Sequence, residues 1–336
     1  MHNVHKEARE SKQVKAIHIH GRGGPDHLVY EDAPQPSPGP GEVLVRVYAA
    51  GIIANELKWD ETYQTKAGSP LTLPIPGRDL SGVVTEVGPG VTTLIKGSEV
   101  SAMLDYGRDG AQADYTVALP NELVPKPSTL DHVQAAAVPL SALTAWQALF
   151  DHAHLAAGQT VLIHGGAGGV GVFAVQLAHW AGAQVITTAS ARNRDFMREL
   201  GVGANEIIDY TTTRFEEVVH SVDVVFDMVG GDTLQRSWQV IKPGGVLVSI
   251  VSPSPPAAAQ VAMSKAKGGG GHDVRFVYFI VGPNRDELIQ IGALIDAGHL
   301  RPIIDTVFPL DQARQAYEQA AKGHTRGKIV LRVMDS

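Results

Sequence analysis

The first third of the chain consists of short apolar stretches separated by turn residues. Residues 14–20, 42–48, 82–87 and 91–101 form such stretches, and β-branched residues alternate with others in 42–48. Alternation with a period of two is typical of half-buried strands. No helix can cross residues 34–41, because prolines interrupt this segment throughout. The pattern predicts a small, mostly antiparallel β domain.

After Pro127 the apolar residues take up helical spacing in some segments and form short continuous runs in others. Helices are expected first at residues 130–137 and 142–155, with Ser128 and Ser141 as candidate capping residues. Beyond them, the expected strands are residues 159–164, 184–188, 206–208, 222–227 and 245–251, and the expected helices are residues 171–181, 191–200, 215–220 and 233–240. Strands that alternate with helices imply right-handed βαβ units and a parallel sheet.

The C-terminal part of the chain begins with a segment of biased composition. Residues 253–272 are rich in proline, alanine and glycine, and are expected to form a loop rather than a packed element. An apolar strand is expected at residues 274–281, at the edge of the sheet. Residues 286–334 then have the pattern helix, strand, helix, strand, and the last strand is expected at residues 328–333.

Length, composition and charge narrow the class of protein. A chain of 336 residues suggests two domains. The absence of cysteine excludes disulfides, a cysteine nucleophile, thiolate zinc sites and iron–sulfur clusters held by cysteine. With 28 basic and 35 acidic residues the net charge is −7, which argues against a nucleic-acid partner.

The chain carries no evident signal for a membrane or for secretion. No apolar run approaches the ~20 residues that span a bilayer, so no membrane partner is expected. Residues 1–12 are polar and lack the apolar segment of a secretory signal, and we interpret them as a short frayed arm. The expected location is therefore the cytoplasm.

A glycine-rich loop stands between an expected strand and an expected helix. Gly166, Gly168 and Gly171 match the pattern G-x-G-x-x-G, with Gly169 and Val170 between the last two. In a dinucleotide site, Gly166 would form the tight turn, Gly168 would let the backbone approach a pyrophosphate, and Gly171 would let helix and strand pack closely. The helix N-terminus would present N–H donors to the phosphates. The alternative is a strand–helix turn with no ligand; a P-loop is excluded, since no Gly-Lys-Ser/Thr follows.

The residues after the next expected strand favour NADP(H) over NAD(H). An NAD site usually has a carboxylate about twenty residues past the glycine loop, where it bonds the ribose hydroxyls. This chain instead has Ser190, Arg192 and Arg194. Arginine can pair with a 2′-phosphate and serine can donate to it; the alternative is a solvated helix start. Tyr210 follows the third strand and could face either the same phosphate or solvent.

Several segments, taken together and in order, are those of one family. They are residues 40–45 (PGEVLV), 76–84 (PGRDLSGVV), 143–146 (LTAW), the glycine loop and 326–330 (RGKIV). With these motifs the chain resembles the medium-chain dehydrogenase/reductase superfamily, and specifically its zinc-free quinone-oxidoreductase-like branch. The resemblance extends over almost the whole chain, from Val14 to Val333.

This resemblance implies an α/β fold with two domains. Residues 1–137 and 283–336 would form a GroES-like, mostly antiparallel β domain that serves substrate and catalysis. Residues 138–282 would form a Rossmann domain with a doubly wound parallel sheet, and NADP(H) would lie in the cleft between the domains.

The resemblance also implies positions for single residues. Thr144 would lie near the nicotinamide ribose or phosphate, unless it only caps or packs. Lys328 would approach the cofactor phosphates, unless it is a solvated strand end. The adenine and nicotinamide ends of the cleft would be lined by Val229, Gly230, Ile250 and Val251.

Two positions depart from the zinc-dependent relatives. Those relatives have cysteine where Ile53 stands and histidine where Arg78 stands. The close histidine pairs, at 18/20 and 152/154, lack the spacing of a zinc site. No metal, and in particular no zinc, is therefore expected. Many zinc-free relatives have asparagine at the position of Ile53, so that polar contact is missing as well.

Arg78 has two interpretations. It could orient an anionic or carbonyl substrate, or it could form an ion pair with Asp79 or Glu56, and we favour the ion pair. Asn55 and Trp59 lie close by in the sequence, and their roles are open.

The leading hypothesis is an NADPH-dependent reductase of quinones or α,β-unsaturated carbonyls. Hydride chemistry belongs to the nicotinamide, so the protein mainly positions it against an acceptor. Without a metal to polarise an alcohol, reduction of a conjugated acceptor is more attractive, because donors or water can stabilise the developing oxyanion. The catalytic residues are unknown; Arg78, Tyr63 and Tyr106 are the candidate donors.

Two other functions stay open. One is a zinc-free alcohol dehydrogenase or enoyl-thioester reductase on the same fold, and the other is a non-catalytic NADPH-binding sensor or structural protein. The expected partners are a small-molecule substrate and further copies of the chain. Phe276, Tyr278 and Phe279 place aromatic residues on the expected sheet edge, which predicts a homodimer or homotetramer.

Overall fold

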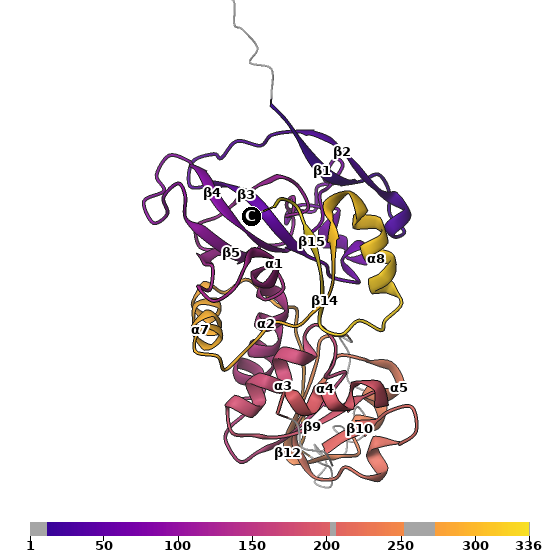
Figure 1. Ribbon diagram of the computed structural model, residues 1–336. Coiled ribbons are helices and arrows are strands. Elements are labelled where there is room, and N and C mark those ends of the chain that lie inside the picture. Colours follow the sequence, from indigo (N-terminus) through magenta and orange to yellow (C-terminus); the bar gives the residue numbers. More distant parts are fainter. Residues whose placement is uncertain (1–11, 202–205, 252–272, 336) are drawn as a thin grey trace, which may run out of the picture.

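The computed structural model describes residues 12–201, 206–251 and 273–335. These residues form two domains, one built on a parallel sheet and one on a mostly antiparallel sheet (Figure 1). The expected frayed arm at residues 1–12, apart from Lys12, and the expected loop at 253–272 lie outside the described residues.

The parallel sheet has the strand order β10-β9-β8-β11-β12-β13, and each strand pairs in parallel with its neighbours. The bounds are Thr160–His164 (β8), Gln184–Ala189 (β9), Ile207–Asp209 (β10), Val222–Asp227 (β11), Ile241–Ser249 (β12) and Arg275–Tyr278 (β13). This is the strand order of dinucleotide-binding Rossmann domains, and the order reverses beside β8. The loop after β8 therefore lies where such folds bind ligands. The predicted doubly wound parallel sheet is confirmed.

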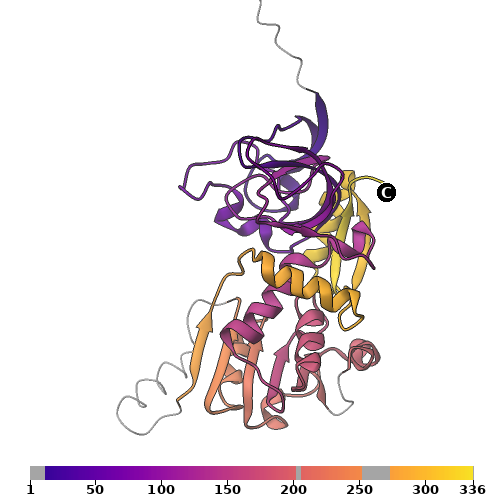
Figure 2. The same ribbon diagram turned by 90° about the vertical axis from the view of Figure 1, so that its left-hand side faces the viewer.

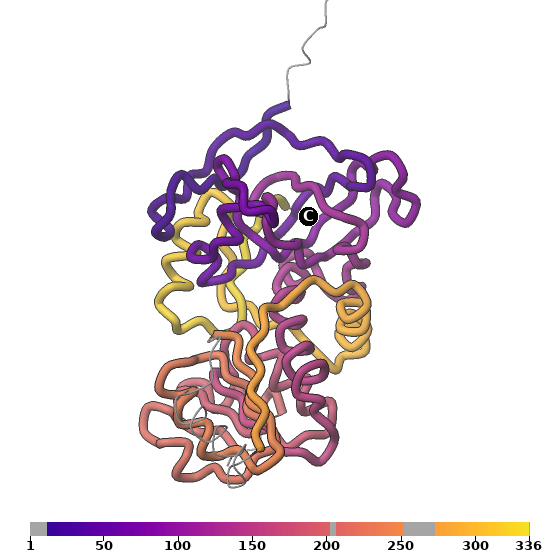
Figure 3. The backbone as a smooth tube through the Cα atoms, turned by 180° about the vertical axis from the view of Figure 1, so that it is seen from behind, coloured from indigo at the N-terminus to yellow at the C-terminus, as the bar shows by residue number. Residues whose placement is uncertain are grey.

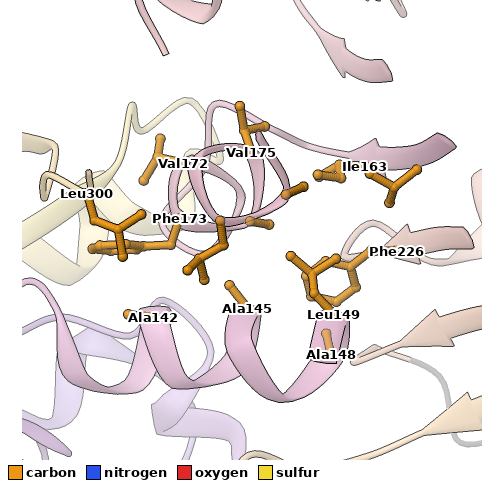
Figure 4. Packing of buried hydrophobic residues seen from close by; sticks show 14 of the residues in the cluster. Ala142, Ala145, Ala148, Leu149, Ile163, Val172, Phe173, Val175, Phe226 and Leu300 are labelled. Atoms are coloured by element: carbon orange, nitrogen blue, oxygen red, sulfur yellow. The ribbon is translucent and has the colours of Figure 1, made fainter. Parts of the chain in front are cut away.

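Among the described residues, the helices α3 (Gly171–Trp180), α4 (Arg194–Glu199) and α5 (Gly231–Ser237) connect strands of this sheet. Helix α2 (Pro139–Trp146) packs against α3. Figure 4 shows Phe173 on the side of α3 that faces Ala142 and Ala145 of α2, whereas Val175 lies on the opposite side of α3 and Phe226 of β11 lies beside Leu149. Both helices are thus buried in the largest core of the protein, which fixes the start of α3 against the end of β8.

One helical stretch of the described residues has the length and composition of a membrane span, contrary to the expectation from the sequence. It runs from His132 to His152 and comprises α1 (His132–Ala135), α2 and the π-helical turn η4 (Gln147–His152). Most of the stretch is buried inside the protein. A helix in the core of a large domain has this composition too, so the stretch is only weak evidence for a membrane partner.

The second sheet has the order β14-β15-β3-β4-β5-β7, and β6 pairs with β3. The bounds are Val43–Gly51 (β3), Asp79–Val87 (β4), Glu99–Met103 (β5), Tyr115–Ala118 (β6), Leu123–Pro125 (β7), Ile304–Pro309 (β14) and Lys328–Arg332 (β15). β14 and β15 pair in parallel, and the remaining pairs are antiparallel. β1 (Gln13–Ile19) and β2 (Leu28–Pro34) form a separate antiparallel pair.

Segments from both ends of the chain build this β domain. β15 pairs with β3, with Val330 opposite Gly51, so the C-terminal strands lie beside strands from the first hundred residues (Figure 3). Helix α8 (Ala313–Ala321) packs against β15 and β2. Helix α7 (Arg285–Asp296) lies between the two domains in Figure 2 and packs against α2 and β7. The domain bounds given above stay a prediction.

Several elements differ in extent from the prediction. The strand expected at residues 91–101 begins only at Glu99, because residues 91–98 form turns, with Gly97 at a φ of 92°. The strand expected at 245–251 begins earlier and is β12. The helix expected at 215–220 is a single 3-10 turn, η7 (Phe215–Glu217), and the helix expected at 142–155 ends in the π-helical turn η4.

Neither serine that was expected to cap a helix does so. Asp131 and Gln134 form a capping box at the start of α1, which satisfies backbone donors at both positions. Ser128 lies before this box and donates its backbone N–H to Asp296. Ser141 is buried inside α2, because that helix already begins at a proline in its first turn.

Helix α7 carries a buried carboxyl group that makes stability depend on pH. Glu287 is 9% exposed and accepts a hydrogen bond from Gln147 Nε2 at 2.8 Å. Burial, opposed by this hydrogen bond and reinforced by Asp151, raises the pKa of Glu287 from 4.5 to about 7. The folded chain therefore holds the proton more tightly than the unfolded chain. The free energy of unfolding must then fall as the pH rises from about 4.5 to about 7.

We expect Glu287→Gln to remove this pH dependence and to stabilise the protein by about 1–2 kcal/mol above neutral pH. Thermal unfolding measured on both sides of the window from about pH 4.5 to about pH 7 checks the prediction. Glu318→Gln on α8, where the carboxylate is exposed, is the matched control and should leave the slope unchanged. If the free energy of unfolding changes equally with pH in the wild type and in Glu287→Gln, the prediction is contradicted.

Candidate active site

A cleft of about 920 Å³ lies at the carboxyl ends of β8, β9, β11 and β12. Its walls come from both domains. The parallel sheet supplies the glycine loop and the residues that follow β9, β11 and β12, and the β domain supplies residues 52–55, Trp59, Tyr106 and the segment before β15. A cleft at this edge of an α/β sheet, closed by a second domain, is the usual place for a dinucleotide and its substrate.

The glycine loop is closely packed in a way that the motif alone did not show. Gly165, not Gly166, has the left-handed backbone of the tight turn, with a φ of 79°. A Cβ on Gly166 would lie 2.1 Å from Thr187 Oγ1 of β9, so this glycine serves close packing between neighbouring strands. A Cβ on Gly171 would lie 2.2 Å from the carbonyl oxygen of Gly165. Gly171 therefore lets α3 approach β8, as predicted.

Gly168 differs from these residues because the protein itself leaves room beside it. The nearest atom to a Cβ at this position would be 3.4 Å away, which is ordinary van der Waals contact. Gly168, Gly169 and Val170 all line the cleft. The loop is thus a cradle that fits a pyrophosphate, with backbone exposed where the phosphates of a dinucleotide would lie.

We expect Gly168→Ala to fold normally and to weaken binding of NADPH about tenfold, because the added methyl group occupies the cradle rather than the core. Thermal unfolding and titration of NADPH by calorimetry measure the two effects. Gly292→Ala on α7, which also adds a methyl group in ordinary contact, is the control. Unchanged NADPH affinity in Gly168→Ala would show that no phosphate lies against this loop.

His164 ends β8 directly before the glycine loop and was missed by the sequence analysis. It is fully buried, and its Nε2 lies 2.9 Å from Ser237 Oγ. Because Ser237 Oγ already donates to the Thr233 carbonyl, it accepts from His164, which fixes the Nε2–H tautomer. Burial, together with the charge of Arg236, lowers the pKa of His164 to about 3. His164 is thus a neutral link between β8 and α5, and the signal for it was a polar residue that ends an apolar strand.

The adenosine end of the cleft brings together most of the residues predicted for a 2′-phosphate. Ser190, Arg192 and Tyr210 line the cleft. Arg192 Nη2 also donates to the carbonyl oxygen of His324, from the segment before β15, at 3.0 Å. Arg194, by contrast, is exposed at the start of α4 and lies outside the lining formed by the described residues.

A second contact joins the two domains at this end. Arg326 donates from Nε and Nη2 to Asn193 Oδ1, at 3.1 and 3.0 Å, and its guanidinium lies 4.8 Å from the centre of the Phe196 ring. The sequence analysis placed Arg326 in a family motif without a role. Residues 193 and 326 are far apart in the sequence, and only the closed β domain brings them together.

The residues predicted at the ends of β11 and β12 have different surroundings. Val229, Ile250 and Val251 line the cleft, as expected. Gly230 has a φ of 75°, donates its N–H to the Asp227 carboxylate and packs against Val251, but it is not part of the lining.

Lys328 lies deep in the cleft in a buried ion pair. It is 5% exposed, and its Nζ donates to Asp79 Oδ2 at 2.9 Å. Asp79 Oδ1 in turn accepts from the backbone N–H of Leu140 at the start of α2. The Lys328 side chain also lies against Gly169 of the glycine loop. Lys328 is therefore not the solvated strand end that was the alternative, and it stands beside the place predicted for the phosphates.

Thr144 combines the two roles considered for it. Its hydroxyl donates to the Leu140 carbonyl at 2.6 Å, one turn earlier in α2, and its side chain is buried. It also lines the cleft. Its role toward a nicotinamide stays a prediction.

The other end of the cleft is aromatic. Ile53, Asn55, Trp59 and Tyr106 line it, and the rings of Trp59 and Tyr106 meet edge to face with centroids 6.1 Å apart. Burial, with a further contribution from the Glu56 charge, raises the pKa of Tyr106 above its ordinary value. The phenol is therefore protonated at neutral pH and can donate a hydrogen bond into the cleft.

The other two candidate donors are occupied elsewhere. Tyr63 donates its hydroxyl to the Leu57 carbonyl at 2.6 Å. Arg78 is 1% exposed and pairs through Nε with Glu56 Oε1 at 3.2 Å, not with Asp79, which holds Lys328. Among the residues described, neither candidate belongs to the lining of the cleft.

No group of three or more metal-ligating side chains is found in the described parts of the chain. His18 and His20 both contact the same oxygen of Glu31. The expectation that the protein holds no zinc stays a prediction.

Comparisons with known proteins agree with this architecture. Residues 39–128 match the alcohol dehydrogenase GroES-like domain, and residues 202–331 match the zinc-binding dehydrogenase family. The GroES-like part of the fold prediction is thereby confirmed. The chain is 35% identical to the probable zinc-binding oxidoreductase, mitochondrial, of Arthroderma benhamiae, over 91% of this chain and 93% of that protein.

Two further relatives carry more specific names. The chain is 32% identical to the NADPH-dependent alkenal/one oxidoreductase, chloroplastic, of Arabidopsis thaliana, over 98% of this chain and 82% of that protein. The solved structure of the quinone oxidoreductase from Coxiella burnetii superposes with a TM-score of 0.85 at 34% identity, over 96% of this chain and all of that one.

Proposed function

Because the chain belongs to the medium-chain dehydrogenase/reductase family, in its quinone-oxidoreductase-like branch, and is an oxidoreductase of that family, we propose that it transfers hydride from NADPH to a quinone or an α,β-unsaturated carbonyl without zinc. The observation that carries the proposal is the contrast between the two ends of one cleft. One end offers a glycine cradle with Ser190 and Arg192, and the other offers the Trp59 and Tyr106 rings beside Ile53.

The cofactor, when bound, supplies the hydride, and the protein's groups hold and orient the reactants. The glycine loop and Lys328 would hold the pyrophosphate, and Arg192 with Ser190 would hold the 2′-phosphate. Trp59 and Tyr106 form flat apolar walls against which a conjugated acceptor can lie. In this proposal the protonated Tyr106 phenol would donate a hydrogen bond to the acceptor oxygen as negative charge develops on it.

The test is oxidation of NADPH by the purified protein against quinones, enones, aldehydes and an enoyl thioester. We expect turnover with quinones or enones, unchanged activity in a chelator and no stoichiometric zinc by elemental analysis. Turnover confined to aldehydes or enoyl thioesters would favour the alternative enzymes on this fold. NADPH binding without turnover of any acceptor would favour a sensor or structural protein, and tightly bound zinc would overturn the metal-free part of the proposal.

We propose the cytoplasm as the location of the protein. Curated relatives are named as mitochondrial or chloroplastic, so the location needs its own test. Fractionation of the source cells with an antibody against the chain would decide between these compartments.

We also propose a homodimer in which β13 of one copy pairs, along its exposed edge, with β13 of the other copy. This strand ends the sheet, as expected, but its aromatic residues point differently from the prediction: Phe279 is buried and Phe276 packs inward, while Tyr278 and Ile280 are 37% and 62% exposed. No strand of the described residues pairs with this apolar edge, which favours pairing with a second copy.

We expect sedimentation at micromolar concentration to show a dimer or tetramer. Ile280→Asp should raise its dissociation constant at least about tenfold, since a charge at an apolar interface costs more than 1.4 kcal/mol. Ile95→Asp is the matched control, because Ile95 is 72% exposed and lies on the β domain, away from β13. A monomeric wild type would contradict the proposal.

A further inference from the structure

A buried polar network lies directly behind the aromatic end of the cleft. Glu56 and Arg78 form its ion pair, and both side chains are at most 1% exposed. Glu56 Oε2 accepts from the Tyr317 hydroxyl of α8 at 3.1 Å, and that hydroxyl accepts from Gln112 Nε2 at 2.7 Å. Four segments far apart in the sequence thus meet at one buried charge pair.

Trp59 and Tyr106 are the two walls of the aromatic end of the cleft. Arg78 contacts the segments that carry both of them. Its Nε pairs with Glu56, which belongs to η2 (Glu56–Lys58), the turn between Asn55 and Trp59. Its Nη1 donates to the carbonyl oxygens of Asp105 and Arg108, at 2.9 and 3.0 Å, on either side of Tyr106. One guanidinium therefore joins the segment that carries Trp59 to the segment that carries Tyr106.

The segment that carries Tyr106 borders a second cavity on its other side. Residues 105–110 line a second cavity of about 760 Å³, and Tyr106 lines both cavities. A wall between two cavities is held by its hydrogen bonds more than by packing. The bonds from Arg78 hold this wall on the side of the buried network. Other bonds hold it elsewhere: the Asp105 N–H donates to Glu122, Arg108 Nη2 to the Val117 carbonyl, and the Gly110 N–H to the Ile75 carbonyl.

The network is poorly suited to a purely structural role. Arg78 Nη2 and Gln112 Oε1 are buried without a partner among the described residues. A buried ion pair with an unsatisfied donor gives less stability than well-packed apolar side chains of the same volume. What the guanidinium provides, and apolar side chains cannot, is a set of donors in a fixed plane that bonds two segments at once.

We infer that Arg78 is a positioning residue for the acceptor: it fixes the spacing of the Trp59 and Tyr106 rings and thereby sets the selectivity of the cleft between flat two-ring acceptors and small ones. Arg78 touches neither cofactor nor acceptor. The substrate class in this inference rests on the proposed function, but the positioning of the rings does not.

The activity test compares naphthoquinone with methyl vinyl ketone as acceptors. Arg78→Lys keeps the charge beside Glu56 but cannot bond both segments, so the KM for naphthoquinone should rise about ten- to a hundredfold relative to that for methyl vinyl ketone. The dissociation constant of NADPH should stay within about twofold, because the cradle lies at the other end of the cleft. Tyr317→Phe is the matched control, since it removes a hydrogen bond to Glu56 from the same network and leaves the bonds from Arg78 to both walls in place. In Tyr317→Phe the acceptor ratio, which is the KM for naphthoquinone divided by the KM for methyl vinyl ketone, should stay at the wild-type value.

A second readout does not depend on turnover. The near-ultraviolet circular dichroism of Trp59, taken as the difference between the wild type and Trp59→Phe, should be lost in Arg78→Lys and kept in Tyr317→Phe. Glu56→Gln, which keeps the shape and removes the charge, should shift both readouts in the same direction by a smaller amount.

The outcomes separate the inference from the proposed function. If the wild type reduces no acceptor, the proposed function fails while the Trp59 signal still tests the positioning. If Arg78→Lys and Glu56→Gln leave both the Trp59 signal and the acceptor ratio unchanged, the inference is overturned. An equal change in Tyr317→Phe would also overturn it, because the effect would then belong to the stability of the network and not to the link between the walls.

Discussion

Lys328→Met should destabilise the protein by about 3–5 kcal/mol, the usual effect of removing one partner of a buried ion pair. The substitution nearly preserves the volume of the side chain, so the loss comes from charge. Asp79, which is fully buried, would keep the N–H of Leu140 as its one hydrogen-bond donor among the residues that the structure describes. An unpaired carboxylate in this position must either be desolvated or take up a proton, and both reduce the stability of the fold.

The same substitution should weaken binding of NADPH, because Lys328 lies against Gly169 in the phosphate cradle. Urea unfolding and NADPH titration measure the two effects. Lys322→Met, which removes an exposed charge just after α8, is the control and should change neither by more than about 0.5 kcal/mol.

A double variant tests the physical reason. Asp79→Asn/Lys328→Met leaves no unpaired charge, so it should be more stable than Lys328→Met alone, in spite of carrying one more substitution. If the stability lost in the double variant equals the sum of the losses in Asp79→Asn and Lys328→Met, the buried pair is not what stabilises this junction between β4, α2 and β15.

The sequence predicted the parallel sheet well because its signals are local. Each central strand is a short apolar run, and the glycine loop stands between such a run and a helix, so the alternation of strands and helices along the chain and the place of the loop follow from adjacent residues. The same signals could not tell which glycine makes the turn. Gly165 and Gly166 are neighbours of the same type, and only the contact with Thr187 of β9 assigns close packing to Gly166.

The choice of partners inside the cleft could not be predicted, because it depends on how the β domain closes. Arg78 and Asp79 are adjacent in the sequence, yet they pair with Glu56 and Lys328 on opposite sides of β4. Adjacent residues of a strand point to opposite faces, so an ion pair between them is disfavoured at the start of β4. In the same way, the burial of Phe279 beside the exposed Tyr278 follows from alternation at the end of β13.

Arg192→Ala should weaken binding of NADPH about ten- to a hundredfold and leave binding of NADH almost unchanged. One charge-assisted hydrogen bond contributes ~1.5–3 kcal/mol, and each ~1.4 kcal/mol is a tenfold change in affinity. Arg192 lines the cleft beside Ser190 and Tyr210, so its guanidinium is available to a 2′-phosphate while it also contacts His324. NADH lacks that phosphate and therefore loses nothing when the arginine is removed.

Arg194→Ala is the matched control for Arg192→Ala, since it removes the same charge two residues away. Arg194 is exposed outside the described lining of the cleft, and salt screens charges beyond about 8–10 Å, so its removal should change NADPH affinity by less than about threefold. The ratio of NADPH to NADH affinity, measured for both variants, thus separates a direct contact from the general field of basic residues. If Arg194→Ala has the larger effect, or if the wild type binds NADH more tightly than NADPH, the carboxylate-free end of β9 does not select the phosphate.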